Sequence, residues 1–175
     1  ALRNAHTRHT QGTCVGCIMW ASDSWALYNK APDWVFQNCK FYGSIPSGAG
    51  TFYACLFQDK PYNGTLKDAK HIFRNFKNGT FVDCTIRCDR YTLGWFGGGD
   101  QPRFVRCSFI LGNDGSREAG EVVSYIRHAK LVDCVFRDDL ETLPQEPYEL
   151  RRIDTCEHRN TRIETEAVTD PFANE

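Results

Sequence analysis

The sequence predicts an all-β protein whose short strands stack along one axis, and three observations lead to this prediction. A short motif centred on a cysteine recurs along the chain. Phe, Val, Ile and Thr surround each cysteine, whereas Gly and Asn lie between the motifs. No apolar stripe with a 3.6-residue period appears, so these segments are strands and not helices. A recurrence of this length is typical of a solenoid, in which each repeat buries its apolar face against its neighbours.

The repeated motif reads apolar, two variable residues, Cys, one variable residue, apolar. Its four copies are Phe36–Phe41, Phe81–Ile86, Phe104–Phe109 and Leu131–Phe136, with Ile153–His158 as a degenerate fifth copy and Cys14–Met19 as a candidate first copy. The separations are 22 residues from Cys17 to Cys39, 45 to Cys84, and then 23, 27 and 22 to Cys107, Cys134 and Cys156. Because 45 is close to two periods, we place one additional repeat around Phe52–Phe57.

Each motif must contain a corner if all its apolar positions are to be buried. The cysteine and the apolar residue two later share a strand face, but the apolar residue three earlier would point the opposite way on an unbroken strand. Asn38, Asp83 and Asp133 precede their cysteines, and Asn and Asp tolerate the left-handed conformation of a tight corner; Arg106 and Thr155 suit it less well. The corners predict an inward-facing core ladder of Cys39, Cys84, Cys107, Cys134 and Cys156.

The pattern resembles the right-handed parallel β-helix of the pectate-lyase-like superfamily, in which strand, tight Asn corner and strand repeat once per coil. The resemblance covers residues 14–158 and rests on segments such as Phe-Val-Asp-Cys-Thr-Ile at residues 81–86. It implies a right-handed parallel β-helix of about five or six coils with long loops, and it says nothing about activity. A Greek-key sandwich is the structural alternative. A left-handed hexapeptide helix is disfavoured because no six-residue apolar period appears.

Length and charge divide the chain into one body with two arms. The 175 residues suit a single domain, with an N-terminal arm over residues 1–13, a β-helix body over residues 14–137, and the last coil with an extended acidic C-terminal tail over residues 138–175. The formal net charge of −1 splits into +6 before residue 138 and −7 from there onward. This asymmetry favours docking of the tail on a body, and a solvated tail is the alternative.

The nine cysteines indicate where the protein assembles. Their odd number and even spread favour reduced, buried thiols over a disulfide scaffold, which predicts intracellular assembly. No apolar run reaches 18 residues, so we expect no membrane partner. The positive charge of the body is spread thinly, so we expect no nucleic-acid partner either.

One pattern could hold a metal ion. His6, His9, Cys14 and Cys17 supply four zinc-type ligands in two close pairs, although both cysteines also fit the core motif. Apart from this candidate zinc site we expect no cofactor. The acidic pair Asp138 and Asp139, and the lone His71 and His128, are interpreted as surface residues because no catalytic motif accompanies them.

Aromatic residues are the interface candidates. Trp95 and Phe96 lie in a glycine-rich segment, and Tyr148 and Phe172 lie in the acidic tail. If exposed, they could anchor a protein interface or stack on a sugar ring; the alternative is that they cover the core. Trp20, Trp25 and Trp34 could cap the open N-terminal end of the solenoid.

These observations predict a non-enzymatic structural protein. By analogy with viral members of this fold, we expect a decoration, cement or tail-associated subunit of a virion that forms a homotrimer and binds other subunits. The alternative is a polysaccharide lyase, hydrolase or sugar-binding module that uses the side groove and Trp95, with Asp100 and Asp138 as candidate acids. A zinc-organised N-terminal interaction module is a third hypothesis.

Overall fold

The computed structural model describes residues 2–4, 11–25, 27–29, 33–44, 48–59, 71–74, 76–89, 92–95, 101–112, 123–138 and 150–164. Within these ranges every regular element is a β-strand and every strand pair is parallel. The prediction of an all-β protein with parallel strands is therefore confirmed for the described part of the chain.

The strands form three larger sheets and one pair. The first sheet contains, in spatial order, β2 (Gln11–Val15), β5 (Asp33–Gln37), β7 (Gly48–Tyr53), β10 (Phe76–Val82), β13 (Arg103–Val105), β16 (Lys130–Val132) and β19 (Glu157–Arg159). The second contains β3 (Ile18–Trp25), β6 (Lys40–Ser44), β8 (Leu56–Gln58), β11 (Thr85–Cys88), β14 (Ser108–Leu111), β17 (Val135–Asp138) and β20 (Arg162–Glu164). The third contains β9 (His71–Arg74), β12 (Thr92–Trp95), β15 (Val123–Arg127) and β18 (Leu150–Asp154), and β1 (Leu2–Asn4) pairs with β4 (Leu27–Asn29).

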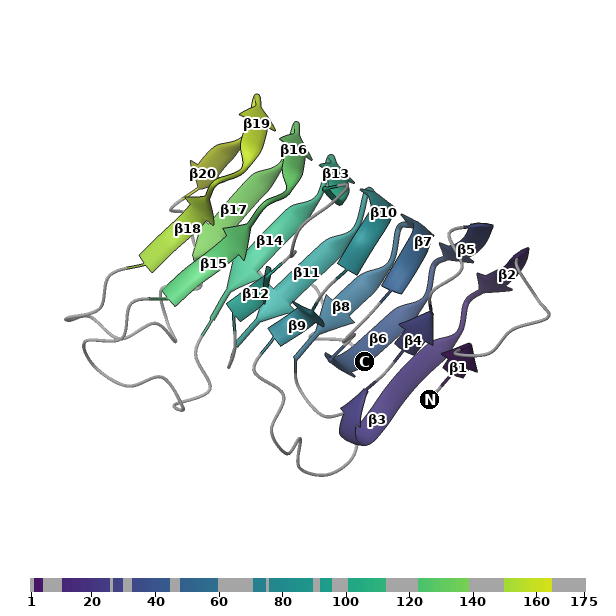
Figure 1. The fold of residues 1–175 in the computed structure, drawn as a ribbon. Coiled ribbons are helices and arrows are strands. Elements are labelled where there is room, and N and C mark those ends of the chain that lie inside the picture. Colours follow the sequence, from purple (N-terminus) through teal and green to yellow (C-terminus); the bar gives the residue numbers. More distant parts are fainter. Residues whose placement is uncertain are drawn as a thin grey trace.

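The chain adds strands to these sheets in a fixed order. Each strand of the first sheet is followed along the chain by one of the second, and from β9 to β18 a strand of the third sheet comes next. Figure 1 shows the result as a progression of colour, from purple strands at one end of the stack to yellow strands at the other. Segments far apart in the sequence therefore lie side by side along the stack.

Each first-sheet strand is followed by one left-handed residue, and one further residue leads into the second-sheet strand. Asn38, Asp83 and Asp133 have φ angles of 51°, 54° and 54°, which confirms the predicted corners. Arg106, which suits the conformation less well, adopts it too with φ of 51°. The corresponding corners of the remaining passes are at Gly16, Ala54 and Asn160.

Phenylalanine rings form the centre of the core in two columns. In the first sheet, Phe36, Phe52, Phe81 and Phe104 follow one another in register. Successive ring centroids in this column lie 4.5–4.8 Å apart, and the ring planes are within 12° of parallel. In the second sheet, the corresponding column is Met19, Phe41, Phe57, Ile86, Phe109, Phe136 and Ile163. Rings of the two columns meet edge to face, so the corner directs both strands toward one shared core.

The cysteines that follow the corners form a third column beside the rings. Cys39, Cys84, Cys107 and Cys134 are buried and lie at successive corners, and Cys55 occupies the same position between Cys39 and Cys84. Each thiol has the backbone carbonyl of the preceding pass as an acceptor: the Sγ of Cys84 lies 3.4 Å from Phe52 O, and that of Cys107 lies 3.5 Å from Phe81 O. A thiol is a weak donor, so each cysteine adds a polar contact to the backbone that a methyl group could not make.

Cys156 differs from the prediction, because it does not continue this column. The amide after Cys134 in the stack is that of Arg162, so Thr161 holds the next position. Cys156 instead lies at the corner between β18 and β19, where its neighbour in the stack is Ala129. The true seventh copy of the motif is His158–Ile163, which contains neither Phe nor Cys.

Candidate functional site

The structure places only part of the predicted interface. Trp95 is the last residue of β12, where its backbone pairs with Arg74 and Arg127. Phe96, Tyr148 and Phe172 lie outside the described residues. The role of these four aromatics therefore stays a prediction.

The candidate zinc site is likewise described in part. Cys14 faces inward on β2 as the first member of the phenylalanine column, and Cys17 precedes Cys39 in the cysteine column. His6 and His9 lie outside the described residues. Among the residues that the structure describes, no group of three or more His, Cys, Asp or Glu side chains is placed to hold a metal ion.

A pocket of about 400 Å³ lies on the outer face of the first sheet, near its C-terminal end. Its lining residues come from three adjacent strands: Arg103, Lys130, Leu131, Val132, Glu157, His158 and Arg159. The register explains why they meet, because Arg103, Lys130 and Glu157 stand opposite one another on β13, β16 and β19. Val132 and Arg159 pair in the same way two residues later, so two outward-facing rows border the hollow.

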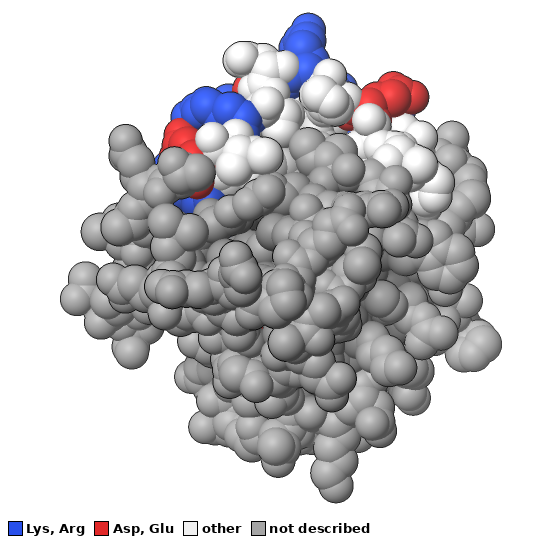
Figure 2. All heavy atoms as spheres, turned by 90° about the vertical axis from the view of Figure 1, so that its left-hand side faces the viewer, with Lys and Arg blue, Asp and Glu red and all other residues white. Residues whose placement is uncertain are grey.

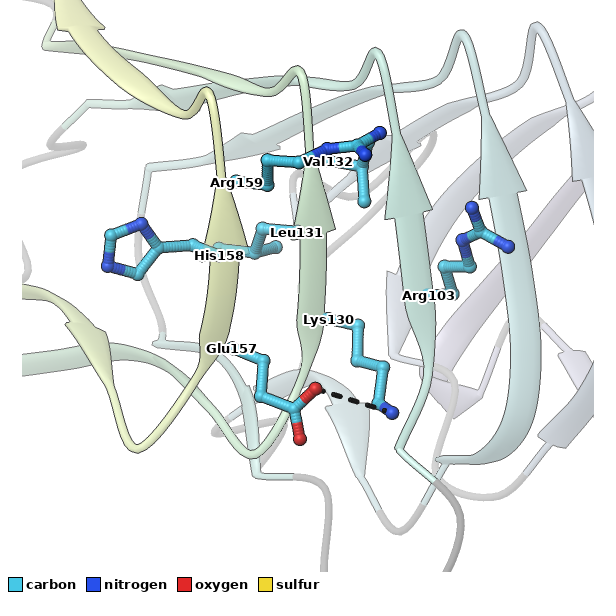
Figure 3. A pocket seen from close by; sticks show the side chains of 7 residues that line it. All are labelled: Arg103, Lys130, Leu131, Val132, Glu157, His158 and Arg159. Carbon is cyan, nitrogen blue, oxygen red and sulfur yellow. Dashed lines mark ion pairs between the residues drawn. The ribbon is translucent and has the colours of Figure 1, made fainter.

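The pocket has an excess of positive charge. Nζ of Lys130 and Oε2 of Glu157 form an exposed ion pair of 3.3 Å, which leaves the guanidinium groups of Arg103 and Arg159 as the other charges of the lining. In Figure 3, Arg159 extends from β19 past Val132, whereas His158 points away from β16, off the end of the stack. A guanidinium presents several donors in one plane and binds carboxylate, sulfate or phosphate in a bidentate manner. Chemically, this surface suits an acidic ligand.

Sequence reasoning missed this pocket, although its signal is in the numbering. Arg103, Lys130 and Glu157 are separated by 27 residues each. That spacing equals the distance between Cys107 and Cys134, so the three residues fall in one row once the repeats are aligned. The sequence gives the first pass length correctly, but the spacing of 22 residues from Cys134 to Cys156 misstates the second, because Thr161 and not Cys156 holds the next position.

A second row of polar groups follows the exposed corners. The carboxylate of Asp83 accepts two hydrogen bonds from the guanidinium of Arg106, at 2.7 and 2.8 Å. These hydrogen bonds hold the pKa of Asp83 below its usual value. Two passes further on, the side-chain amide of Asn160 donates to Asp133 at 3.0 Å. Arg106 thus occupies a left-handed corner with its side chain bound to the corner before it.

The outer face of the second sheet carries a buried ion pair. Nε of Arg87 lies 2.9 Å from both carboxylate oxygens of Asp89, and the side chains are 7% and 2% exposed. The backbone amide of Asp89 donates to Oδ1 of Asp59, which is also buried. A buried ion pair of this kind fixes geometry more than it adds stability, because desolvation offsets the attraction.

Comparisons with known proteins identify no relative. No family model, curated protein or solved structure matches the chain. None of the described residues forms a helix that is long and apolar enough to cross a membrane.

Proposed function

We propose that the three sheets are the sides of one right-handed parallel β-helix, and that the chain is a non-enzymatic structural subunit of a larger assembly. The repeated strand order supports the helix, since parallel neighbours in all three sheets arise when a chain winds around one axis. A right-handed winding accords with the hand of about 98% of crossovers between parallel strands of one sheet. Seven strands in each of two sheets would then correspond to seven turns, against the five or six expected.

The observation that carries the structural role is the continuity of the core. Within the described ranges, phenylalanine rings and thiols follow one another through successive passes as one apolar cluster, so these passes pack as one body. Each pass contacts mainly its two neighbours, and the body ends in strand edges with no described partner. A body of this kind is suited to binding other subunits and to holding them at a fixed distance. We therefore propose that the chain is a decoration, cement or tail-associated subunit of a virion. It would assemble inside the cell as a homotrimer.

Light scattering on a size-exclusion column tests the trimer. We expect a mass about three times that of the chain, and a lower affinity for partner subunits when the acidic residues of the tail are neutralised. Truncation after Glu164 is the sharper variant. The strands continue to that residue, so truncation at any earlier residue would remove part of the stack. The triple variant Glu166→Gln, Asp170→Asn, Glu175→Gln is the length-matched control for charge. A chain that stays monomeric and binds no partner subunit would contradict the proposal.

The pocket favours a second candidate function, the binding of an acidic polysaccharide along the outer face of the first sheet. Calorimetric titration with polygalacturonate should give binding that the double variant Arg103→Ala, Arg159→Ala abolishes. Arg106→Ala is the matched control, because Arg106 is exposed but already paired with Asp83. Binding that is equal in both variants would exclude the pocket. Release of unsaturated or reducing ends, lost in Asp100→Asn or Asp138→Asn, would identify an enzyme instead.

A further inference from the structure

The two ends of the stack carry complementary sets of unused backbone groups. In one ladder of six hydrogen bonds, each corner amide donates to the carbonyl just before the next corner, from Gly16 to Gln37 at one end and from Asp133 to Arg159 at the other. All six are 2.9–3.0 Å long. Among the described residues, the amide of Asn160 is the next donor in this ladder, and the carbonyl of Val15 is the acceptor that would precede its first bond. Neither group has a backbone partner in the described part of the chain; the thiol of Cys17 lies 3.5 Å from Val15 O.

A second ladder ends in the same way. The amide after each cysteine, and after Thr161 in the last pass, donates to the carbonyl of the cysteine in the preceding pass, from Lys40 to Cys17 through to Arg162 to Cys134, over 2.8–3.1 Å. Within the described ranges, the amide of Ile18 and the carbonyl of Thr161 are the groups left over. Each end of the stack therefore presents what the other end lacks.

Exposed apolar side chains gather at the same two edges. Of the five large apolar residues that are exposed in the described part of the chain, three lie on the first two strands of the stack, Val15 at 59%, Ile18 at 49% and Trp20 at 40%. A fourth, Ile163 at 49%, lies on the last strand. Only Tyr53, at 42%, is in the middle. Ile163 holds an inward position in the column of Phe136, whereas Val15, Ile18 and Trp20 hold outward positions beside Gln37, Lys40 and Tyr42, where a further pass would cover only their exposed edge.

The side chains of the two edges also match in register. Residues 13–20 and 157–164 have the same plan, with three strand residues, a left-handed corner at Gly16 or Asn160, one further residue and three strand residues. The inward positions at the C-terminal edge are His158, Thr161 and Ile163, in register with buried residues of the preceding pass. They carry no carboxylate or guanidinium group. The charged residues of these two strands, Glu157, Arg159, Arg162 and Glu164, hold the alternate, outward positions, which stacking would leave in water. Figure 2 shows Lys and Arg side chains beside Asp and Glu side chains along the upper rim of the molecule.

The strands outside the two seven-stranded sheets also leave complementary positions at the two ends of the stack. Parallel pairing of β1 with β4 places β1 one pass before β4, ahead of β2 and β3. At the other end, the described strands finish with β20, so the last pass has no described strand on its third side. A following copy would bring its β1 to that position.

We propose that this chain stacks head to tail on a second copy of itself, with β2 and β3 of one copy pairing in parallel with β19 and β20 of the other. The contact would extend both ladders by one bond, Asn160 to Val15 and Ile18 to Thr161, and would place Met19 on Ile163. This inference rests on the proposed assembly role, names the partner as a second copy of the chain, and replaces the homotrimer by an open series. Because the two contacting surfaces differ, each new copy leaves a free end, and the product is an open series rather than a closed oligomer.

Two single variants test the proposal by complementation. Cys17→Asp places a carboxylate at an inward position of the N-terminal edge, where Cys17 is half-buried in the single chain, and leaves the C-terminal edge intact, whereas Ile163→Asp does the reverse. We expect analytical ultracentrifugation to show concentration-dependent series for the wild type and association weakened about tenfold or more in each variant alone, as burial of a carboxylate requires. An equimolar mixture of the two variants should form one-to-one dimers that grow no further. Tyr53→Asp, which is similarly exposed but lies mid-stack, should assemble as the wild type does.

Hydrogen exchange provides a readout that needs no variant. In the wild type, the amides of Asn160 and Ile18 should become protected as the protein concentration rises, whereas the amide of Asp83, already bonded within the stack, should not change. A wild-type chain that stays monomeric with unchanged exchange at both edges would overturn the inference. If both variants and their mixture still form the trimer and bind partner subunits, the stacking is wrong and the proposed function stands. Loss of partner binding without any effect at the edges would refute the function alone.

Discussion

Replacing Phe81 by alanine should cost far more stability than the same replacement near the end of the stack. Phe81 is fully buried, with Phe52 and Phe104 stacked on its two faces at centroid distances of 4.8 and 4.5 Å. Phe57 and Phe73 approach it from other directions, at 5.6 and 5.1 Å. The neighbouring passes fix all four rings, so the cavity left by Phe81→Ala cannot collapse.

The magnitude follows from known cavity costs. A buried Phe→Ala change costs about 3–5 kcal/mol, and we expect Phe81→Ala at about 5 kcal/mol because its surroundings are rigid. Phe136 stacks on Phe109 at 4.6 Å, but the next residue in its column is the half-exposed Ile163. Water and side chains can enter there, so we expect Phe136→Ala at about 3 kcal/mol. A domain of this size is stable by about 5–15 kcal/mol, so both changes are measurable.

Urea unfolding followed by circular dichroism measures both variants, with the midpoint and the slope fitted separately. We expect a clear shift of the midpoint and a slope that equals that of the wild type, since the surface exposed on unfolding is nearly unchanged. Equal costs for the two variants, or a greater cost for Phe136→Ala, would refute the idea that cohesion is greatest in the middle of the stack.

Three further predictions concern the thiols, an acidic residue and two glycines. The six buried cysteines, Cys39, Cys55, Cys84, Cys88, Cys107 and Cys134, should react with Ellman's reagent only as fast as the chain unfolds. Burial raises the pKa of the Cys39 thiol to about 11 and that of Cys84 well above its usual value, and rapid reaction of more than three native thiols would contradict this. Hydrogen bonds from Arg137, and then from Arg162, lower the pKa of Glu164, so its stabilising effect is present above the unfolded-state pKa and is lost as the pH falls through the folded-state pKa. Glu164→Gln should therefore reduce the difference in unfolding free energy between neutral and acid pH, and an unchanged difference would argue against the pair. Gly12→Ala should lower stability by about 1–3 kcal/mol, because the added Cβ would lie 2.8 Å from the Trp34 ring. The Cβ added by Gly16→Ala would meet no neighbour, so this variant should lose about 1–2 kcal/mol of stability through its φ of 63° alone. Calorimetric melting of both glycine variants measures the two losses.

The fold could be predicted from the sequence wherever the motif carries its own geometry. Asn38, Asp83 and Asp133 indicate a left-handed corner, and the apolar residues on either side indicate what the corner must bury. Arg106 shows the limit of this reasoning, because its corner is supported by the carboxylate of Asp83 in the preceding pass. No local propensity contains that contact.

Cys156 shows why the end of the repeat could not be predicted by residue type. The last copy has His158 in place of Phe and Thr161 in place of Cys, and only Asn160 retains the corner chemistry. Among the described residues, an edge strand packs against only one neighbouring pass of its own chain, so fewer of its inward positions need a large apolar side chain. A search for cysteine therefore selects the nearest one, which lies at a different corner.

The surfaces were the least predictable part. Arg103, Lys130 and Arg159 carry no motif, and they meet only because the passes that hold them have the same length. Arg87 and Asp89 hold outward positions that would be solvated in an isolated sheet, yet both are buried. Such positions depend on neighbours contributed by distant segments, which composition and periodicity do not reveal.

The uneven spacing of the corners has a consequence for engineering. From Cys39 to Cys55 a pass takes 16 residues, and from Cys55 to Cys84 it takes 29, yet both keep the rings and thiols in register. The tolerance for extra length therefore belongs to the connections and not to the columns. Foreign peptides grafted between Asp59 and His71 should leave the melting temperature close to that of the parent, which would make this chain a display platform with several independent attachment points.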